Sequence, residues 1–409
     1  MIKKINNWSD IYTDSSVKFS VHVEASTRCN SRCPACPRFI DSTPVTNPNL
    51  PLDELKYEDF VKWFPSSFLK KYAGRFNFCG NYGDPLMCVD IDKIIEYLVN
   101  NDVETIIIHT NGGIRSEKVW SKLGSLLNSQ KRHVIFSVDG LEDTNNLYRR
   151  EVSWKNIVKN IKTFNAAGGF SVQDFLVFKH NQHQIEEVKQ FFEYLGVKST
   201  NIKSPFGMFD EENKQYVKRP VFDSKGNFTH YLETADRFKV DGYSDFKETV
   251  EGYTEEDVIK NKQEWVKLAL KDAKNYKAEI FYTNKEEAIS RYSYVEDYDI
   301  ECKALSEYSE VFLNPNGDIV PCCFLGQIIN EHHPTDDIIT RENFKPFSQM
   351  NLNNSSIESI LGILDDKIAS KWGCSHKEGR SVTCSKVCGV RKHNPYSEKN
   401  LYRTSRRLA

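Results

Sequence analysis

Three cysteines near the N-terminus, Cys29, Cys33 and Cys36, have types and spacing that suit metal chemistry. Three residues separate the first pair and two separate the second, so one loop can wrap three thiolates around a single metal centre. A four-iron cluster has four corners and is normally held by four cysteines. Three local thiolates without a fourth nearby therefore predict an iron–sulfur cluster with one iron open to another ligand.

Two other interpretations of this cysteine loop are a structural zinc site and unrelated core cysteines. Zinc prefers a closed tetrahedral set of Cys or His. His22 lies just before the loop, but a fourth ligand at zinc-knuckle spacing is missing, so iron is favoured. Arg28, Arg32 and Arg38 flank the loop, and we expect them to offset thiolate charge and lower the thiol pKa values.

Alternating strands and helices must position this loop. The expected strands are 19–24, 76–79, 105–109, 134–138, 175–178 and 200–203. The expected helices are 57–64, 91–100, 117–127, 154–165 and 185–195. Such alternation predicts an α/β fold with parallel strands and right-handed crossovers. Six units suit an open doubly wound sheet or a partial barrel, and periodicity does not separate the two.

The length of 409 residues predicts two or three domains. We assign residues 1–205 to the strand–helix domain and residues 206–300 to an insertion or connecting segment with a helix from 254 to about 273. Residues 301–409 form a third part, a loop-like sequence that holds most of the remaining cysteines. Within it, a turn at 314–317 predicts a small hairpin that delivers Cys322.

Composition places the chain among cytosolic proteins. With 55 Lys and Arg against 57 Asp and Glu, the net charge of −2 gives no overall attraction to nucleic acid or membrane. No apolar run approaches the ~18–20 residues that span a bilayer, and we see no signal peptide. Eleven cysteines in a reducing compartment favour metal binding or catalysis over disulfides. We therefore expect a cytoplasmic protein without a membrane partner.

The pattern C-x3-C-x2-C directly after a first β-strand resembles the radical S-adenosylmethionine (radical SAM) enzymes. This resemblance implies a partial (β/α)6 TIM-like barrel. It also implies a 4Fe-4S cluster on Cys29, Cys33 and Cys36 whose open iron is chelated by SAM. In that family the reduced cluster cleaves SAM to methionine and a 5′-deoxyadenosyl radical, which abstracts hydrogen from the substrate. The family usually has an aromatic residue before the third cysteine, where this chain has Ala35.

Further segments that resemble this family follow successive predicted strands, where α/β folds collect ligands. The loop ending in Asp84 looks like the Gly-Gly-Glu-Pro-type motif that holds the SAM amino group, with Asp in place of Glu. A later string resembles the family's Ser-x-Asp-Gly … Tyr-Arg pattern, in which Arg149 or Arg150 could pair with a carboxylate. The resemblance implies SAM contacts from Gly80, Tyr82, Gly83, Asp84, Asn111, Ser137, Asp139 and Asn181.

The cysteines after residue 300 resemble parts of the SPASM motif, which holds auxiliary iron–sulfur clusters in radical SAM enzymes. Two fully cysteine-ligated clusters need eight thiolates and six are present, so we expect one auxiliary 4Fe-4S cluster in a SPASM/twitch-like domain and two clusters per chain. We assign its ligands as Cys302, Cys322, Cys384 and Cys388, with Cys374 as the alternative fourth. Cys323 should face away from Cys322. A zinc ribbon is the competing interpretation, although its usual C-x2-C pairs are absent.

The predicted function is that of a radical SAM oxidoreductase. An auxiliary cluster suggests that an electron leaves the substrate radical, which favours net oxidation of a small molecule, with flavodoxin or ferredoxin as external electron donor. Peptide modification is the alternative, and RNA modification rests only on the basic stretch 377–409. A non-catalytic iron–sulfur electron carrier is the alternative from another class. The sequence identifies no catalytic base.

Overall fold

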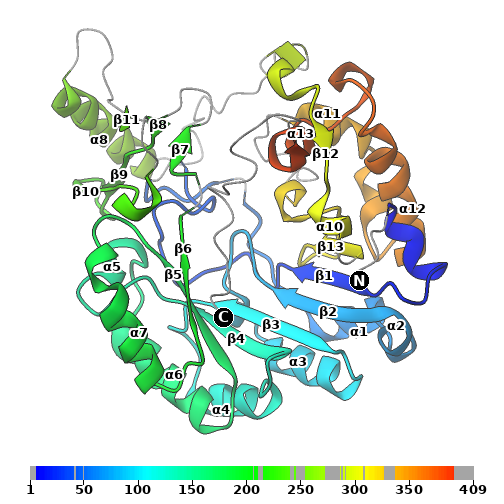
Figure 1. The fold of residues 1–409 in the computed structure, drawn as a ribbon, viewed down its shortest axis with the longest axis horizontal. Coiled ribbons are helices and arrows are strands. Elements are labelled where there is room, and N and C mark those ends of the chain that lie inside the picture. The colour runs from blue at the N-terminus through cyan, green and yellow to red at the C-terminus, as the bar shows by residue number, and fades with distance from the viewer. Residues whose placement is uncertain are drawn as a thin grey trace. The chain divides into compact units, whose positions relative to one another are not determined.

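In the computed structural model, the chain divides into two compact units. Figure 1 shows its helices and strands. The described residues are 6–40, 43–48, 50–205, 207–210, 215–239, 244–245, 254–271, 286, 289–290, 292–306, 309–326 and 337–390. Among them, the first unit takes residues 6–28, 51–108 and those from 286 to 390. The second unit takes the described residues within 29–50 and 109–271.

The first unit contains a mostly parallel set of strands in the order β14-β13-β1-β2-β3. These are β1 (Phe19–Val23), β2 (Ala73–Phe78), β3 (Thr105–Thr110, whose last two residues belong to the second unit), β13 (Ser309–Leu313) and β14 (Ile319–Val320). Strand β1 pairs in parallel with β2 and β13, and β13 pairs antiparallel with β14. The predicted hairpin is confirmed: its turn places Gly317 at φ +92°, a backbone region that favours glycine.

Helices of the first unit have one apolar face, as the sequence spacing dictates. Those in the N-terminal half are α1 (Tyr57–Trp63), α2 (Ser66–Tyr72) and α3 (Ile91–Asn100). Those after residue 300 are α10 (Lys303–Ser306), α11 (Ile338–Asn343), α12 (Ile357–Lys367) and α13 (Val382–Cys388). The loop-like interpretation of residues 301–409 is therefore wrong for the described part. Ser356 caps α12, which buries Ile357, Ile360, Leu361 and Leu364 at helical spacing.

In the second unit, three strands are parallel in the order β4-β5-β6. They are β4 (Arg132–Ser137), β5 (Ser171–Leu176) and β6 (Thr200–Lys203). The helices that precede or follow them are α4 (Glu117–Leu126), α5 (Asn145–Tyr148), α6 (Trp154–Ala166) and α7 (Ile185–Tyr194). The predicted strand 175–178 began four residues too late, because β5 starts with buried polar side chains. Gln173, for example, donates to the Val138 carbonyl (2.9 Å).

The segment after β6 adds small sheets and one long helix. Its strands are β7 (Phe209–Asp210), β8 (Gln215–Tyr216), β9 (Arg219–Phe222), β10 (Phe228–Leu232) and β11 (Ser244–Asp245). The helix predicted from residue 254 is confirmed as α8 (Glu255–Lys271). Its capping box is present, since Thr254 N–H donates to Asp257 (2.9 Å) and Asp257 N–H donates back to the Thr254 hydroxyl (3.2 Å).

Short elements complete the description. In the first unit, β12 (Asp299–Ile300) pairs antiparallel with β15 (Gly389–Val390). The 3-10 helices are η1 (Trp8–Tyr12), η2 (Pro85–Met87), η3 (Gln182–Gln184), η4 (Asp236–Phe238), η5 (Ser293–Val295), η6 (Cys323–Leu325), η7 (Phe347–Met350), η8 (Ala369–Lys371) and η9 (His376–Glu378). None of the helices in the described part of the chain combines the length and apolar character needed to cross a bilayer. Most of the basic stretch 377–409 lies outside the described residues.

These elements confirm the α/β fold with mostly parallel strands that the sequence predicted. The predicted strand 200–203 and helix 91–100 have the predicted bounds. The loops that follow the strands carry the residues singled out for chemistry.

Candidate functional site

The N-terminal cysteine loop, residues 29–36, belongs to the second unit and is fixed to the backbone that follows α5. The Arg150 carbonyl accepts hydrogen bonds from the Arg32 N–H (3.0 Å) and the Ser31 hydroxyl (3.2 Å). That hydroxyl also lies 3.1 Å from the Cys33 sulfur. The Ser31 N–H donates to the Cys29 sulfur (3.4 Å). Ser31 therefore contacts the sulfur atoms of two of the three cysteines.

Arg149 connects this loop to a buried carboxylate. Its Nε donates to Asp139 Oδ2 at 2.6 Å, and its Nη1 donates to the Cys33 sulfur at 3.7 Å. Burial lowers the pKa of Arg149, but Asp139 and Cys33 raise it well above its ordinary value, so the guanidinium stays charged. The other oxygen of Asp139 accepts from the Leu176 N–H (2.7 Å). Both oxygens of Asp139 are therefore engaged within the protein, in a position that holds Arg149 against Cys33.

Asn111 is the predicted residue that comes nearest to Cys29. Its Nδ2 donates to Asn30 Oδ1 (2.8 Å) and lies 3.9 Å from the Cys29 sulfur, and its Oδ1 accepts from the Gly113 N–H (2.9 Å). Asn111 is buried, so these contacts fix its amide. A thiolate at Cys29 would receive an N–H donor from it.

Burial raises the pKa of one thiol of the loop. The pKa of Cys36 is raised to about 12 because burial disfavours the thiolate and Cys33 adds repulsion, while Arg38 and Arg149 oppose the shift only in part. Arg38, one of the flanking arginines, lowers the pKa of Cys36 as predicted, but burial outweighs its effect. A bound cation reverses this balance, because metal-coordinated thiols lose their protons.

In the first unit, the loop after β2 is organised by Glu24, a residue that the sequence analysis left unassigned at the end of the first strand. The Glu24 carboxylate is fully buried. It accepts backbone hydrogen bonds from the N–H groups of Asn81 (2.5 Å), Tyr82 (3.3 Å) and Gly83 (2.9 Å). An acidic residue at the end of an apolar strand was the signal that could have identified it, since such a group requires buried donors.

The glycines of this loop are required by close approach of backbone and carboxylate. A Cβ atom on Gly80 would lie 2.3 Å from Glu24 Oε1, and one on Gly83 would lie 1.7 Å from the Ser26 carbonyl oxygen. Asp84 is buried, and its carboxylate caps η2 by accepting from the Leu86 N–H (2.9 Å). The Asp84 N–H donates to the Arg28 carbonyl (2.9 Å), one residue before Cys29 in the chain. Tyr82 is also buried.

Ser137 and Asn181 have different environments. Ser137 is half-buried as the last residue of β4. Asn181 is fully buried and holds the end of β5 together: its Nδ2 donates to the Asp139 carbonyl (2.9 Å), and its Oδ1 accepts from the Phe178 N–H (2.8 Å). The Asn181 side chain thus supports the segment that carries Asp139.

Four of the five cysteines proposed for the auxiliary cluster line one cavity in the first unit, namely Cys302, Cys322, Cys384 and Cys388. Pairing of β12 with β15, and a hydrogen bond from Glu301 N–H to the Cys388 carbonyl (2.9 Å), bring Cys302 beside Cys388. The β13–β14 hairpin delivers Cys322, and Cys384 lies one turn before Cys388 on α13. Cys374 and Cys323 do not line this cavity.

The thiols that line this cavity affect one another's pKa values. The pKa of Cys302 is raised, first by a hydrogen bond with Cys388 and then by burial and its other thiol neighbours. Burial also raises the pKa of Cys322, and raises that of Cys384 to about 12. Neutral thiols in one buried group become a strong ligand set when a metal displaces their protons.

Trp372 supplies a further feature of this cavity. Its indole nitrogen is buried and, within the described residues, lacks an acceptor at standard hydrogen-bond geometry. It nevertheless lies close enough to Cys384 to favour the thiolate, although burial has the larger effect on that pKa. Trp8 lines the same cavity, but its indole N–H donates to the Glu310 carbonyl (2.7 Å). The two tryptophans therefore differ: the Trp8 N–H is engaged by a carbonyl, whereas the Trp372 N–H lies near Cys384 without a standard hydrogen bond.

Replacing Trp372 by Phe should lower the reduction potential of a cluster bound in this cavity. The variant would lose an N–H donor to sulfur, and such a donor stabilises the more negative, reduced state of a cluster. We expect a fall on the order of 60 mV, which is a tenfold change for one electron. Anaerobic potentiometry with EPR detection measures it, and Trp8→Phe is the matched control with no expected fall. Equal shifts in both variants would contradict the proposed role of Trp372.

The N-terminal cysteine loop and the cavity cysteines both offer the sulfur ligands that iron–sulfur clusters require. Among the described residues, no three Cys, His, Asp or Glu side chains stand at the mutual distances of a formed metal site. The donor chemistry fits nevertheless. Three thiols share a short loop with Arg149 and Asn111 as donors to sulfur, and four thiols share a cavity with the buried indole N–H of Trp372.

Several solved structures are similar to this chain. Streptococcus suis SuiB bound to S-adenosylmethionine is 15% identical with a TM-score of 0.43; the match covers 76% of this chain and 61% of SuiB, so the chain spans less than two thirds of that protein. Native anSMEcpe with AdoMet and the Cp18Cys peptide is 13% identical with a TM-score of 0.45, covering 84% of this chain and 80% of that one. BtrN in complex with AdoMet and 2-DOIA is 24% identical with a TM-score of 0.24, covering 30% and 46%.

A search among curated proteins found no match to this chain. The model of the Radical SAM superfamily matches residues 23–192. The match begins at the end of β1 and includes the N-terminal cysteine loop, the loop that Glu24 organises, and the residues around Arg149. Over residues 23–192, this chain is therefore similar to the Radical SAM superfamily.

Proposed function

We propose that this chain is a radical SAM oxidoreductase in which Cys29, Cys33 and Cys36 hold a SAM-cleaving 4Fe-4S cluster. The observation that carries the proposal is the trio of thiols on one loop inside the matched domain, with donors from Arg149 and Asn111 directed at two of the sulfurs. When bound and reduced, such a cluster supplies the electron that cleaves SAM to methionine and a 5′-deoxyadenosyl radical.

The protein's own residues would orient and stabilise these groups. Arg149 would offset negative charge at Cys33, and Asp139 would keep Arg149 in place. Glu24 would hold the loop 80–84 in one conformation for the SAM amino group. Ser137 would contact SAM from the end of β4, while Asn181 would act by fixing the backbone around Asp139.

We further propose that residues 301–409 form a SPASM/twitch-like domain with one auxiliary 4Fe-4S cluster on Cys302, Cys322, Cys384 and Cys388. The shared cavity of these four cysteines supports this set over one that includes Cys374. Residues 206–300 would connect the two cluster-binding parts. An auxiliary cluster would accept an electron from the substrate radical, which makes the net reaction an oxidation, and flavodoxin or ferredoxin would supply the electron for SAM cleavage.

The test is anaerobic reconstitution with iron and sulfide, followed by SAM and dithionite. We expect 5′-deoxyadenosine and methionine to accumulate with time. A non-catalytic electron carrier would close every cluster with protein ligands, so it would give neither product above the protein-free background. That second result would overturn the proposal.

A further inference from the structure

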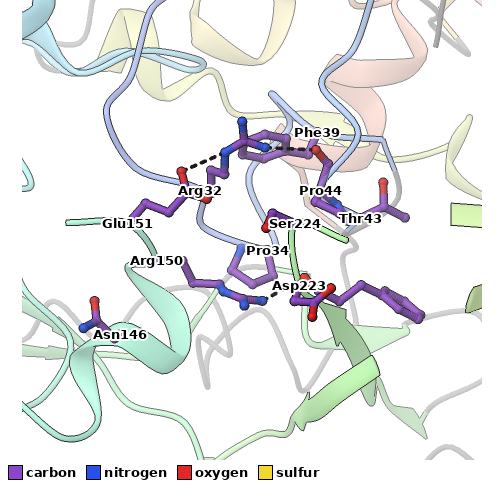
Figure 2. A pocket seen from close by; sticks show the side chains of 11 residues that line it. Arg32, Pro34, Phe39, Thr43, Pro44, Asn146, Arg150, Glu151, Asp223 and Ser224 are labelled. Carbon is purple, nitrogen blue, oxygen red and sulfur yellow. Dashed lines mark hydrogen bonds and ion pairs between the residues drawn. The ribbon is translucent and has the colours of Figure 1, made fainter. Parts of the chain in front are cut away.

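A cavity of 290 Å³ lies in the second unit against the N-terminal cysteine loop (Figure 2). Three segments line it: the cysteine loop and the residues after it, the chain just after α5, and the turn after β9. Arg32, Phe39, Arg150, Glu151, Phe222 and Asp223 are the lining residues that matter here. Its volume is close to the lower bound for small-molecule sites, about 300 Å³, so it holds a chemical group or a small ligand and not a whole peptide.

The two acidic residues of the lining have partners of their own. Glu151 forms an ion pair with Arg32, with Oε2 at 2.9 Å from Nε (Figure 2). Asp223 accepts from the N–H groups of Lys225 (2.9 Å) and Asn227 (2.8 Å), so its carboxylate stabilises the turn between β9 and β10. Their negative charges are thus already compensated by hydrogen bonds and one ion pair.

Arg150 donates its hydrogen bond in the described part of the chain to a neutral group, and its positive charge also helps to lower the pKa of the neighbouring Asp223. Its Nη1 donates to the Phe222 carbonyl at 2.8 Å. A guanidinium carries five N–H donors in a planar fork, so further donors remain for a ligand. This fork matches carboxylate and phosphate oxygens, which it binds through two parallel hydrogen bonds.

The rest of the lining suits a ligand with an apolar part next to its anionic group. Phe39 and Phe222 are both buried and contribute aromatic rings to the wall. The Arg32 side chain is 41% exposed and the Glu151 side chain is 52% exposed. An ion pair this exposed is weak, so Arg32 can exchange Glu151 for an anionic ligand. Glu151 also has φ +65°, a strained backbone region for a non-glycine residue, of the kind that collects at ligand sites.

We propose that this cavity binds an oxyanion group, a carboxylate or a phosphate, of a ligand whose apolar part packs against Phe39 and Phe222. Arg150 is the main contact, and Arg32 is the second. The site adjoins the cysteine loop, because Arg32 lies between Cys29 and Cys33. The identification of this ligand as the enzyme's substrate rests on the proposed function; the binding itself does not.

The competing account is that Arg150 only fixes the β9–β10 hairpin through the Phe222 carbonyl. Three probes that share a 2-phenylethyl part separate the two accounts: 3-phenylpropionate, 2-phenylethyl phosphate and the neutral 3-phenylpropan-1-ol. Equilibrium dialysis against the full-length, reconstituted protein measures their binding. We expect at least one anionic probe to bind tenfold or more tightly than the alcohol, and the tighter of the two identifies carboxylate or phosphate as the preferred group.

Arg150→Gln should weaken the anionic probe at least tenfold, and Arg150→Lys should weaken it less. Arg237→Gln is the control, since Arg237 is exposed in η4 and outside the cavity, and it should change nothing. Equal binding of the alcohol and both anions, or equal binding by the Arg150→Gln and Arg237→Gln variants, would overturn the proposal. So would complete displacement of the probe by SAM, because the cavity would then belong to the SAM site.

A second variant and an assay of 5′-deoxyadenosine distinguish failure of this proposal from misfolding and from failure of the proposed function. If Arg150→Gln does not fold by circular dichroism, Arg32→Gln and the anion-to-alcohol ratio of the wild type decide the question. Formation of 5′-deoxyadenosine without added substrate is measured on the same sample. If it forms while no anion is preferred, this inference fails and the proposed function stands; if it does not form while the anion binds, the reverse holds.

Discussion

Replacing Cys29, Cys33 and Cys36 together by Ala should abolish 5′-deoxyadenosine formation and reduce the iron content from about eight to about four per chain, because one of two four-iron clusters is lost. The three thiols lie on one loop and belong to a different compact unit from the four thiols of the auxiliary cavity. Loss of the first cluster should therefore leave the second in place. Iron and sulfide analysis after anaerobic reconstitution measures both numbers.

Cys374→Ala is the matched control for this experiment. Cys374 belongs to the same unit as the auxiliary cavity but does not line it. This variant should keep about eight irons per chain, as two complete four-iron clusters require. Retention of all iron by the triple variant would contradict the first assignment. Loss of about four irons by Cys374→Ala would show that Cys374, and not Cys384, completes the auxiliary set.

Glu24→Ala should destabilise the first unit and raise the Kd for SAM at least a hundredfold. The substitution removes the acceptor of three backbone N–H groups and leaves them buried without a partner. Hydrogen bonds to a charged acceptor contribute ~1.5–3 kcal/mol each, so we expect a loss of about 3–5 kcal/mol after partial relaxation. The loop 80–84 would lose its fixed conformation for the same reason.

Chemical denaturation and equilibrium dialysis with SAM measure the two effects. Glu58→Gln is the control, because Glu58 is exposed on α1. Glu24→Gln should give an intermediate result, since it keeps the shape but replaces one accepting oxygen by an amide donor. Wild-type SAM affinity in Glu24→Ala would contradict the role of this carboxylate in shaping the loop.

Strand–helix alternation was enough to predict most of the elements within residues 23–192, because the helices there are amphipathic and the central strands are apolar. The first residues of β5 were not predicted as strand because they include polar side chains. Gln173 and Asp174 are buried there, and both are hydrogen-bonded. After residue 300, the sequence contains apolar residues at helical spacing, namely Ile357, Ile360 and Leu364. This pattern predicts a helix, but we interpreted the segment only through its cysteines. These errors concern buried polar groups and the helices after residue 300.

Residue roles were harder to predict than elements. Asp139 lies ten residues before Arg149, and the sequence alone does not show whether its carboxylate faces a ligand or that arginine; the structure pairs the two at 2.6 Å. Glu24 looked like the last residue of a strand, and only the loop folded over it reveals three N–H donors. Cys302 and Cys388 meet only through the pairing of β12 with β15, a contact between distant segments that spacing does not encode.

We propose that the first cluster keeps one iron without a protein ligand and that SAM occupies this iron. Electron–nuclear double resonance of the reduced protein, with SAM carrying an oxygen-17 carboxylate and a nitrogen-15 amino group, tests this directly. We expect hyperfine coupling from both labels, and we expect this coupling to disappear in the variant that lacks the N-terminal thiols. A reduced cluster that shows no coupling to either label under saturating SAM would contradict it.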